Sequence, residues 1–96
     1  MGSASVTDGD TIRIGKIRIR FHGIDAPETR QKCKADGEEW GCGSEATQAL
    51  IKIIGQKLVS CNRKGIDRYK RVIGVCRVGA IDLNAWMVIN GWAVAY

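Results

Sequence analysis

The sequence has 96 residues, which suffices for one small domain with a single modest hydrophobic core. Its formal net charge of +5 favours polyanionic partners such as nucleic acid, although the basic residues are spread along the chain and form no electrostatic tail. No apolar run approaches the roughly 18–20 residues that span a bilayer, so the sequence excludes a transmembrane helix and we expect no membrane partner.

The first five residues, MGSAS, have the small-residue composition of an expression-tag remnant, and no signal peptide is visible. We therefore expect residues 1–5 to be disordered or foreign to the domain, which would span residues 6–96 and act as a monomer. If the natural protein is exported, its leader has been removed from this sequence.

Residues 11–21 read TIRIGKIRIRF, in which isoleucine or phenylalanine alternates with arginine or lysine. The alternation predicts two strands joined at the central Gly-Lys pair, a hairpin with one apolar and one basic face. Arg20 falls on the basic face together with Arg18. A further strand is expected between Arg18 and His22.

Residues 26–43 show no apolar periodicity, so we expect a loop there. A helix should follow, because apolar residues recur at intervals of three and four between residues 46 and 54. Ser44 can cap the start of this helix, and Gly55 suits its end.

The stretches KLVSC and RVIGVCRV predict two more strands, separated by the polar loop NRKGIDRYK. Asp82 can cap a last short helix from Leu83 to Asn90. The predicted order is three strands, a helix, two strands and a helix. Short strands with a helix after the third indicate an α+β, mainly β domain, a five-stranded and partly open barrel of the OB type.

Four cysteines allow three disulfide pairings. Cys33 and Cys42 share one polar loop, whereas Cys61 and Cys76 lie in two predicted strands, so we favour Cys33–Cys42 and Cys61–Cys76. The alternative is a zinc site built from all four cysteines, although no two are spaced as in a zinc knuckle. Paired cysteines imply an oxidising compartment, so we expect a secreted or periplasmic protein.

Two acidic clusters, VTDGDT and GIDAPE, flank the predicted hairpin. Their carboxylates lie in turns beside strands and can converge: Asp8, Asp10, Asp25 and Glu28. Two carboxylates about 4 Å apart repel by about 4 kcal/mol at an effective dielectric of about 20, so a cluster requires a cation or a shared proton. Oxygen ligands favour Ca²⁺ or Mg²⁺, and Pro27 could aim the Ala26 carbonyl at the same ion. Alternatively, DGD is an ordinary surface turn and Asp25 braces a loop.

The segments VTDGDTIRI, RFHGIDAPET, DRYKR and LNAWMVINGWA together resemble the staphylococcal nuclease (thermonuclease) family, over nearly the whole chain. The resemblance implies an OB-fold and a Ca²⁺-dependent nuclease that cleaves DNA and RNA to leave 3′-phosphates. It also implies that Asp10 and Asp25 are calcium carboxylates, that Ala26 supplies a carbonyl ligand and that Asp8 lies behind these ligands.

The same resemblance implies three catalytic residues. Glu28 would orient or deprotonate the attacking water, and Arg20 and Arg71 would grip the phosphate. This chemistry suits these residue types, because a guanidinium fork can engage two phosphate oxygens and offset the charge that develops on them. The alternative is that the two arginines are solvated charges on strand faces.

Substrate contacts are implied for Arg68 and Tyr69, and Tyr96 falls near another tyrosine of this kind. Tyr69 could equally be a packing residue, and Trp40 is left without a role. Lys70 departs from the resemblance, because the family usually has glycine there. If the loop needs a positive φ, lysine costs about 1–2 kcal/mol of strain and could mis-aim Arg71; if the loop is relaxed, Lys70 could contact phosphate.

Three functions are therefore considered. The first is a calcium-dependent secreted nuclease, favoured because every implied catalytic and metal position carries a suitable residue. The second is a non-catalytic nucleic-acid-binding OB module. The third is an extracellular interaction module stapled by disulfides.

Overall fold

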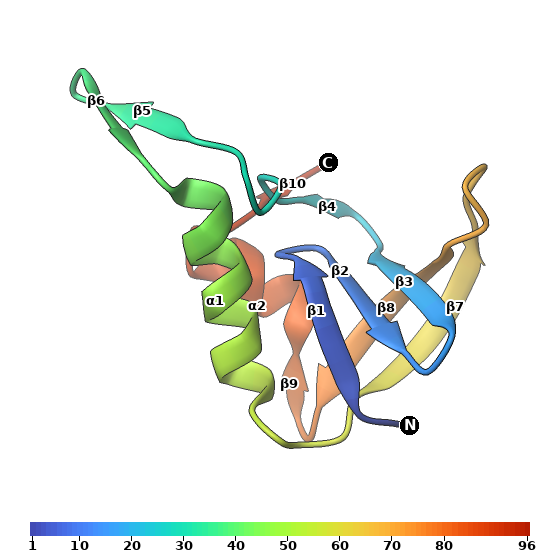
Figure 1. The fold of residues 1–96 in the computed structure, drawn as a ribbon. Coiled ribbons are helices and arrows are strands. Elements are labelled where there is room, and N and C mark those ends of the chain that lie inside the picture. The colour runs from blue at the N-terminus through green and yellow to red at the C-terminus, as the bar shows by residue number, and fades with distance from the viewer.

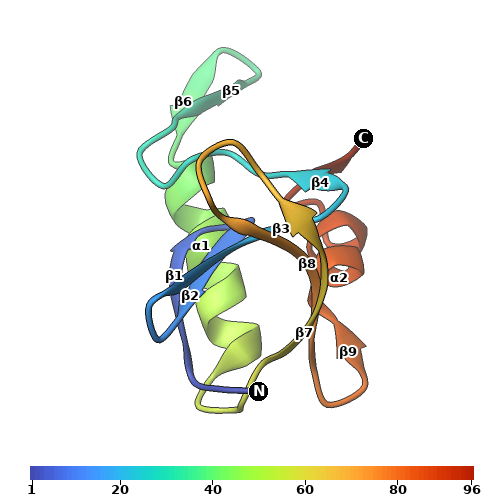
Figure 2. The ribbon, with the colours of Figure 1, turned by 90° about the vertical axis from the view of Figure 1, so that its right-hand side faces the viewer.

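A curled sheet forms the body of the computed structural model, which describes all 96 residues (Figures 1 and 2). Its strands run in the order β1-β2-β3-β8-β7, with β9 paired to β8. Their bounds are β1 (Ala4–Asp8), β2 (Thr11–Ile14), β3 (Ile17–Phe21), β7 (Ser60–Ile66), β8 (Val72–Val78) and β9 (Ile81–Asp82). Neighbouring strands are antiparallel except β3 and β8, which are parallel. The predicted mainly β, OB-type fold is confirmed.

The predicted hairpin is present as β2 and β3, with Ile14 paired to Ile17 across a two-residue turn. Gly15 adopts a φ of 61°, which a residue without a Cβ tolerates best. The further strand expected between Arg18 and His22 is wrong, because these residues belong almost wholly to β3. The remaining strand of the barrel is β1, whose apolar and polar residues alternate over too few positions to stand out in the sequence.

The N-terminal residues take part in the sheet. Ala4 and Ser5, which the sequence analysis placed outside the domain, are the first residues of β1. Gly2 and Val59 exchange two backbone hydrogen bonds of 3.0 and 2.8 Å, and this bridge joins the start of the chain to the segment that enters β7. The bridge thereby connects the two edges of the curled sheet, at β1 and β7 (Figure 2).

Helix α1 (Cys42–Ile54) lies against β1 and ends at Gly55, whose φ of 56° suits a helix terminus. The predicted cap at Ser44 is wrong: the N-cap residue is Gly41, and the helix begins at Cys42. The earlier start depends on Gly43, because a Cβ at this position would overlap the carbonyl oxygen of Glu28.

The expected loop before α1 contains a second hairpin, β5 (Cys33–Ala35) and β6 (Glu38–Trp40), which projects from the body of the molecule (Figure 1). The expectation of an irregular loop is therefore wrong. Each strand has only three residues, so the apolar residues of one face, Cys33, Ala35 and Trp40, span too few positions to show the alternation that predicts strands. The signal that was present is Asp36-Gly37, since both residues have positive φ, as the tight turns of two-residue hairpins require.

Helix α2 (Leu83–Ile89) lies against β8 and is capped as predicted, with the backbone N–H of Ala85 donating to Asp82 Oδ1 at 3.0 Å. The last pair of strands, β4 (Ile24–Asp25) and β10 (Val94–Ala95), joins the chain end to the acidic loop. Neither helix is long and apolar enough to cross a membrane.

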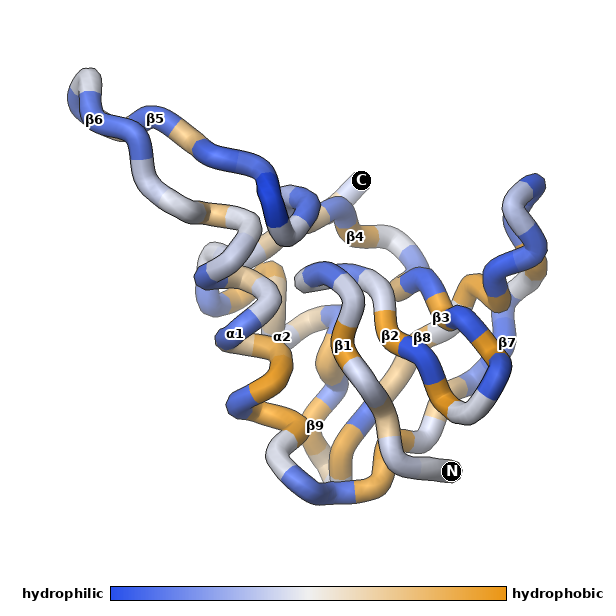
Figure 3. The backbone as a smooth tube through the Cα atoms, in the orientation of Figure 1, coloured by the Kyte–Doolittle hydropathy of each residue, from blue (hydrophilic) through white to orange (hydrophobic).

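The hydrophobic core lies between the inner face of the sheet and the two helices, where the chain is most apolar (Figure 3). Its largest fully enclosed side chains are Phe21, Ile12, Leu50, Leu83 and Met87. The β5–β6 hairpin is mostly hydrophilic and lies outside this core (Figure 3).

Both predicted disulfides are present, and no free cysteine remains for the alternative zinc site. Cys61 and Cys76 face each other directly across β7 and β8, with their Cα atoms 4.0 Å apart. Cys33 and Cys42 join the start of β5 to the first residue of α1 over a Cα distance of 5.6 Å. One bridge therefore crosslinks the main sheet, and the other anchors the projecting hairpin.

Candidate functional site

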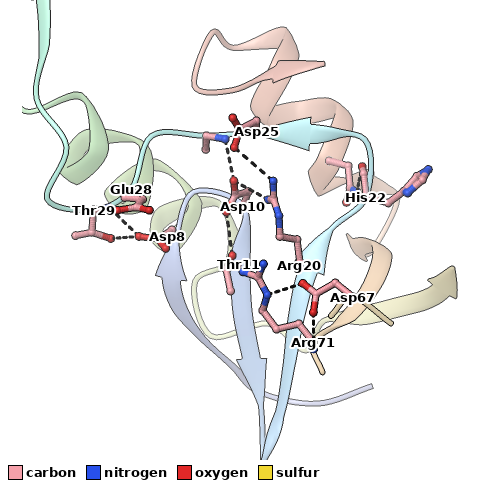
Figure 4. A network of polar contacts seen from close by, with 12 residues as sticks. Asp8, Asp10, Thr11, Arg20, His22, Asp25, Glu28, Thr29, Asp67 and Arg71 are labelled. Carbon is pink, nitrogen blue, oxygen red and sulfur yellow. Dashed lines mark hydrogen bonds and ion pairs between the residues drawn. The ribbon is translucent and has the colours of Figure 1, made fainter. Parts of the chain in front are cut away.

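Asp10 lies at the centre of a polar cluster, in the turn between β1 and β2 (Figure 4). Its side chain is buried, with 6% of the residue exposed. Oδ1 accepts a hydrogen bond from Thr11 Oγ1, and Oδ2 accepts one from the backbone N–H of Ala26, both at 2.9 Å. The carboxylate is therefore fixed in position from two sides.

Arg20 connects Asp10 to Asp25. It lies on β3 opposite Thr11, and its Nη1 is 2.7 Å from Asp10 Oδ2 while its Nη2 is 3.4 Å from Asp25 Oδ1 (Figure 4). The Nη1 contact is an ion pair without hydrogen-bond geometry, so this buried nitrogen has no hydrogen-bond acceptor. Asp25, in contrast, is open to solvent, with 65% of its side chain exposed. One guanidinium thus offsets two neighbouring carboxylates.

The expected convergence of all four carboxylates is not observed. No group of three or more acidic, histidine or cysteine side chains lies close enough to hold one metal ion. Asp8 and Glu28 instead line a separate shallow pocket with Thr7, Thr29 and Arg30, away from Arg20 and Asp25 (Figure 4). The sequence could not separate the two groups, because the turns that carry them are close in both sequence and space.

Asp8 braces the loop that follows Glu28. Its Oδ1 accepts hydrogen bonds from the backbone N–H and the hydroxyl of Thr29, each at 2.7 Å. The Thr29 hydroxyl also lies 2.9 Å from the hydroxyl of Thr47 on α1. Sequence reasoning missed both threonines, because Thr29 is 21 positions from Asp8 and 18 positions from Thr47. No local pattern links residues so far apart.

Glu28 is held through its backbone, whereas its side chain is free. Its carbonyl accepts from Gln31 N at 2.8 Å, its N–H donates to Gln31 Oε1 at 3.3 Å, and Gly43 packs against it. The exposed carboxylate forms no hydrogen bond or ion pair within the chain. It is therefore available to accept a proton or to bind water.

Arg71 is positioned by Asp67, a residue that the sequence analysis did not identify. Asp67 Oδ2 accepts from Arg71 Nε at 2.8 Å, and Oδ1 accepts from the backbone N–H groups of Tyr69 and Arg71 at 2.9 Å. Burial by itself raises the pKa of Asp67, but the hydrogen bonds from Arg71 and Tyr69 outweigh it and lower that pKa. An aspartate whose side chain accepts a hydrogen bond from the backbone N–H two residues later is a local signal for such a turn.

Lys70 adopts a φ of 64°, so the loop does require the left-handed conformation that glycine favours. Of the two alternatives that the sequence left open, a strained loop and a relaxed loop, the structure shows the strained one. Arg71 nevertheless keeps its ion pair with Asp67. The three hydrogen bonds to the Asp67 carboxylate hold the loop on both sides of Lys70.

Arg20 and Arg71 lie on the same face of the sheet (Figure 4). In the parallel pairing of β3 with β8, Arg20 is opposite Ile73, and Arg71 comes two residues before Ile73. Because side chains alternate along a strand, residues two apart share a face. Strands adjacent in the sheet thus bring together two arginines that are 51 positions apart in sequence.

The predicted substrate residues are on the surface. Tyr69 is 56% exposed, and the guanidiniums of Arg68 and Arg71 lie 5.1 and 5.5 Å from its ring centroid. Tyr96 is 77% exposed, and its backbone N–H donates to Gly23 O. Tyr69 therefore stands beside Arg71 as an open aromatic surface, not as a packing residue.

Asp10, Asp25 and Ala26 fit a hard divalent cation as a donor set. They offer two carboxylates and a backbone carbonyl, without sulfur or nitrogen ligands. The hydrogen bond between Ala26 N and Asp10 Oδ2 keeps the two turns together. A set of so few protein ligands would leave coordination positions for water and substrate.

Comparison with known proteins identifies a family and several relatives. Residues 18–96 match the family described as "Staphylococcal nuclease homologue". The chain is 39% identical over 97 residues to the succinoglycan biosynthesis protein ExoI of Rhizobium meliloti, covering 98% of this chain and 51% of that protein. It is 33% identical over 96 residues to an uncharacterized endonuclease of Haemophilus influenzae (95% and 49%) and 34% identical over 104 residues to the micrococcal nuclease of Shigella flexneri (95% and 55%). The chain thus spans about half the length of these relatives.

Proposed function

Because this chain belongs to the staphylococcal nuclease family, we propose that it hydrolyses phosphodiester bonds of DNA and RNA with Ca²⁺ and leaves 3′-phosphates. The names of its endonuclease and micrococcal nuclease relatives support the class of reaction. The structural observation that supports it most is Arg20, which lies between Asp10 and Asp25 and shares a sheet face with Arg71.

Asp10, Asp25 and the Ala26 carbonyl are the proposed holders of the calcium ion. When bound, such an ion offsets the negative charge that builds up on the phosphoryl oxygens. Asp10 is well suited because two hydrogen bonds already fix it. With so few protein ligands, the affinity should be weak, about 10⁻⁴–10⁻³ M as in extracellular calcium modules, and calorimetry showing submicromolar binding would contradict this assignment.

The two arginines are proposed to bind the phosphate. Arg71 is already oriented by Asp67, and Arg20 is already held at the edge of the carboxylate pair. Groups that are oriented before the reaction stabilise the transition state without reorganisation. Arg20 would exchange its ion pairs with Asp10 and Asp25 for phosphate oxygens once a cation occupies the carboxylates. Arg68, Tyr69 and Tyr96 would contact the rest of the nucleotide.

Glu28 is proposed to orient or deprotonate the attacking water. Its exposed carboxylate has no partner within the chain, while its backbone is held by Gln31 and by the packing of Gly43. A general base must come within about 3 Å of the proton that it removes. Asp8 supports this role indirectly, because it holds Thr29 immediately after Glu28.

The test is digestion of plasmid DNA in Ca²⁺ and in EGTA, with Glu28→Ala, Arg71→Ala and the matched surface variant Arg63→Ala. We expect calcium-dependent cleavage that falls about 10²–10³-fold or more in the first two variants, by analogy with the loss of an oxyanion-hole donor. Arg63→Ala should cleave normally, because Arg63 is an exposed strand arginine without an ion pair. Calcium-dependent cleavage that survives both Glu28→Ala and Arg71→Ala would refute the assignment.

A non-catalytic nucleic-acid-binding module is the second candidate. The observation that favours it is the separation of Glu28 from Arg20 and Asp25, together with the absence of a three-carboxylate cluster. Binding of DNA without any cleavage in Ca²⁺ would support this alternative. The two disulfides support an extracellular or periplasmic location in either case.

A further inference from the structure

A pocket of about 290 Å³ opens directly beside the proposed calcium ligands, and the proposed reaction gives it no role. Asp25 and Ala26 belong both to this pocket and to the candidate site. The remaining lining comes from the loop after Ala26, from the base of the β5–β6 hairpin and from the chain end, and it includes Pro27, Gln31, Cys33, Trp40 and Cys42. Whatever occupies the pocket therefore lies next to the proposed calcium ligands.

The walls of this pocket are mostly apolar and carry one exposed aromatic ring. Trp40 is 39% exposed at the end of the hairpin, and the Cys33–Cys42 bridge and Pro27 contribute further apolar surface. Gln31 contributes an uncharged polar side chain to the lining, and its Oε1 already accepts a hydrogen bond from the backbone N–H of Glu28. A flat, weakly polar ligand is favoured by such a lining.

Two cations are sequence neighbours of Gln31, which lines the pocket, although neither of them lines it. Arg30 and Lys32 are exposed on either side of Gln31, and neither forms an ion pair within the chain. Exposed aromatic rings interleaved with unpaired cations are typical of surfaces that bind single-stranded nucleic acid, where bases stack and phosphates are neutralised. The net charge of +5 favours the same partner.

The hairpin fixes the position of Trp40 before any ligand arrives. Trp40 pairs with Cys33 across β5 and β6, and Cys33 is bonded to Cys42, two residues after Trp40. The Asp36-Gly37 turn closes the other end of the hairpin. A residue whose backbone is held in this way loses less conformational freedom when it binds a ligand.

We propose that this pocket is a nucleobase subsite, in which Trp40 stacks on the base next to the scissile phosphate. The proposal rests on the proposed function for the place of the phosphate. It is separate from the Tyr69 surface, because Tyr69 lies in the loop before β8 and does not line this pocket. The subsite would recognise the ring of a base regardless of sequence, since every base has a stacking face.

The test measures binding without cleavage. Anisotropy of a fluorescein-labelled thymidine hexanucleotide in EGTA gives the affinity of the wild type, Trp40→Ala, Trp40→Phe and the exposed control Ile89→Ala. We expect Trp40→Ala to bind about 5–150-fold more weakly, and Trp40→Phe to recover most of the loss because it restores a stacking ring. Ile89→Ala, on the exposed surface of α2 and outside this pocket, should bind as the wild type does.

A hexanucleotide with abasic sites separates stacking from charge and folding. Wild type and Trp40→Ala should bind the abasic strand equally, because the ring has no base to contact. If Trp40→Ala weakens the abasic and the normal strand by the same factor, or weakens neither, the subsite is refuted. If base-dependent binding is present but plasmid DNA is not cleaved in Ca²⁺, the proposed hydrolysis fails while the subsite stands. Cleavage without any dependence on Trp40 overturns the subsite alone.

Discussion

Two segments on either side of the β1–β2 turn bring charged residues toward the candidate site, and they are held by different means (Figure 1). The Asp67–Arg71 loop is closed by its own hydrogen bonds, three of which end on one carboxylate. The segment 27–41, which includes the β5–β6 hairpin, is joined to the body of the molecule by a disulfide, by Asp8 and by the close contact at Gly43. Arg71, the proposed phosphate-binding arginine, is therefore fixed locally, whereas the proposed general base depends on distant residues.

The largest change should come from removing the disulfides one at a time. Replacing Cys61 and Cys76 by serine opens a crosslink with a sequence separation of 15 and should lower the free energy of unfolding by about 3 kcal/mol. Replacing Cys33 and Cys42, with a separation of 9, removes about 2.5 kcal/mol in the same chain-entropy estimate. Urea denaturation measures both losses.

The two serine pairs should differ more in nucleic-acid binding than in stability. The Cys33–Cys42 bridge anchors a hairpin outside the core, so its loss frees Trp40. We expect this loss to weaken binding of the hexanucleotide about as much as Trp40→Ala does. The Cys61–Cys76 bridge lies within the main sheet, so its loss should leave that affinity unchanged at temperatures where the variant is folded. Equal effects of the two pairs of serine substitutions on binding would show that the segment 27–41 is held by contacts other than its disulfide.

The next largest effect is expected for Gly43→Ala, which tests the contact between α1 and Glu28. Alanine favours a helix by about 1 kcal/mol over glycine, but its Cβ would overlap the Glu28 carbonyl oxygen, and overpacking costs about 1–3 kcal/mol. The net result should be a less stable protein with lower turnover, because the loop that carries Glu28 must shift. Gly65→Ala is a control, since a Cβ there meets no atom within 4 Å. A more stable and fully active Gly43→Ala protein would contradict the contact.

A smaller effect of opposite sign is expected at Lys70 in the other loop. Glycine should relieve the strain of a positive φ and stabilise the folded protein, by about 1 kcal/mol at most, because glycine also gains freedom in the unfolded chain. Thermal unfolding of Lys70→Gly checks this. A lower melting temperature would show that the Lys70 side chain stabilises the folded protein by more than its positive φ destabilises it.

The smallest effect is the pH dependence that Asp67 contributes. Hydrogen bonding lowers its pKa in the folded protein below the ordinary value of 3.8, so its stabilising effect is fully present above that value and is lost as the pH falls through the lower, folded pKa. Asp67→Asn should therefore be less stable than the wild type at neutral pH, and the difference should shrink below pH 4. Urea denaturation across this range measures it, and a difference that grows in acid would refute the assignment.

The parts of the fold that local patterns encode were predictable from sequence. The β2–β3 hairpin alternates regularly, Asp82 caps α2 through a contact three residues away, and the cysteine positions favoured the observed pairs. The β5–β6 hairpin was missed because each of its strands has only three residues, too few to show a regular alternation, even though its Asp-Gly turn was visible.

The candidate site was only partly predictable. Family motifs pointed to the acidic residues and arginines, but the placement of Arg20 between two carboxylates follows from strand pairing and turn packing that the sequence does not display. Bracing by Thr29 and Thr47 joins separate elements and has no local signature. Asp67 could have been found, since the carboxylate accepts hydrogen bonds from backbone groups within its own loop.

The position of Arg20 also bears on how the protein matures. Its guanidinium is a built-in counter-ion for Asp10 and Asp25, so their mutual repulsion does not have to await an external cation. We therefore expect the chain to reach its native state where calcium is scarce and to take up the ion afterwards, unlike small zinc domains that remain unfolded without their metal. A protein with the proposed calcium requirement would stay inactive until it met a calcium-rich environment, which would protect the nucleic acids of the cell that makes it.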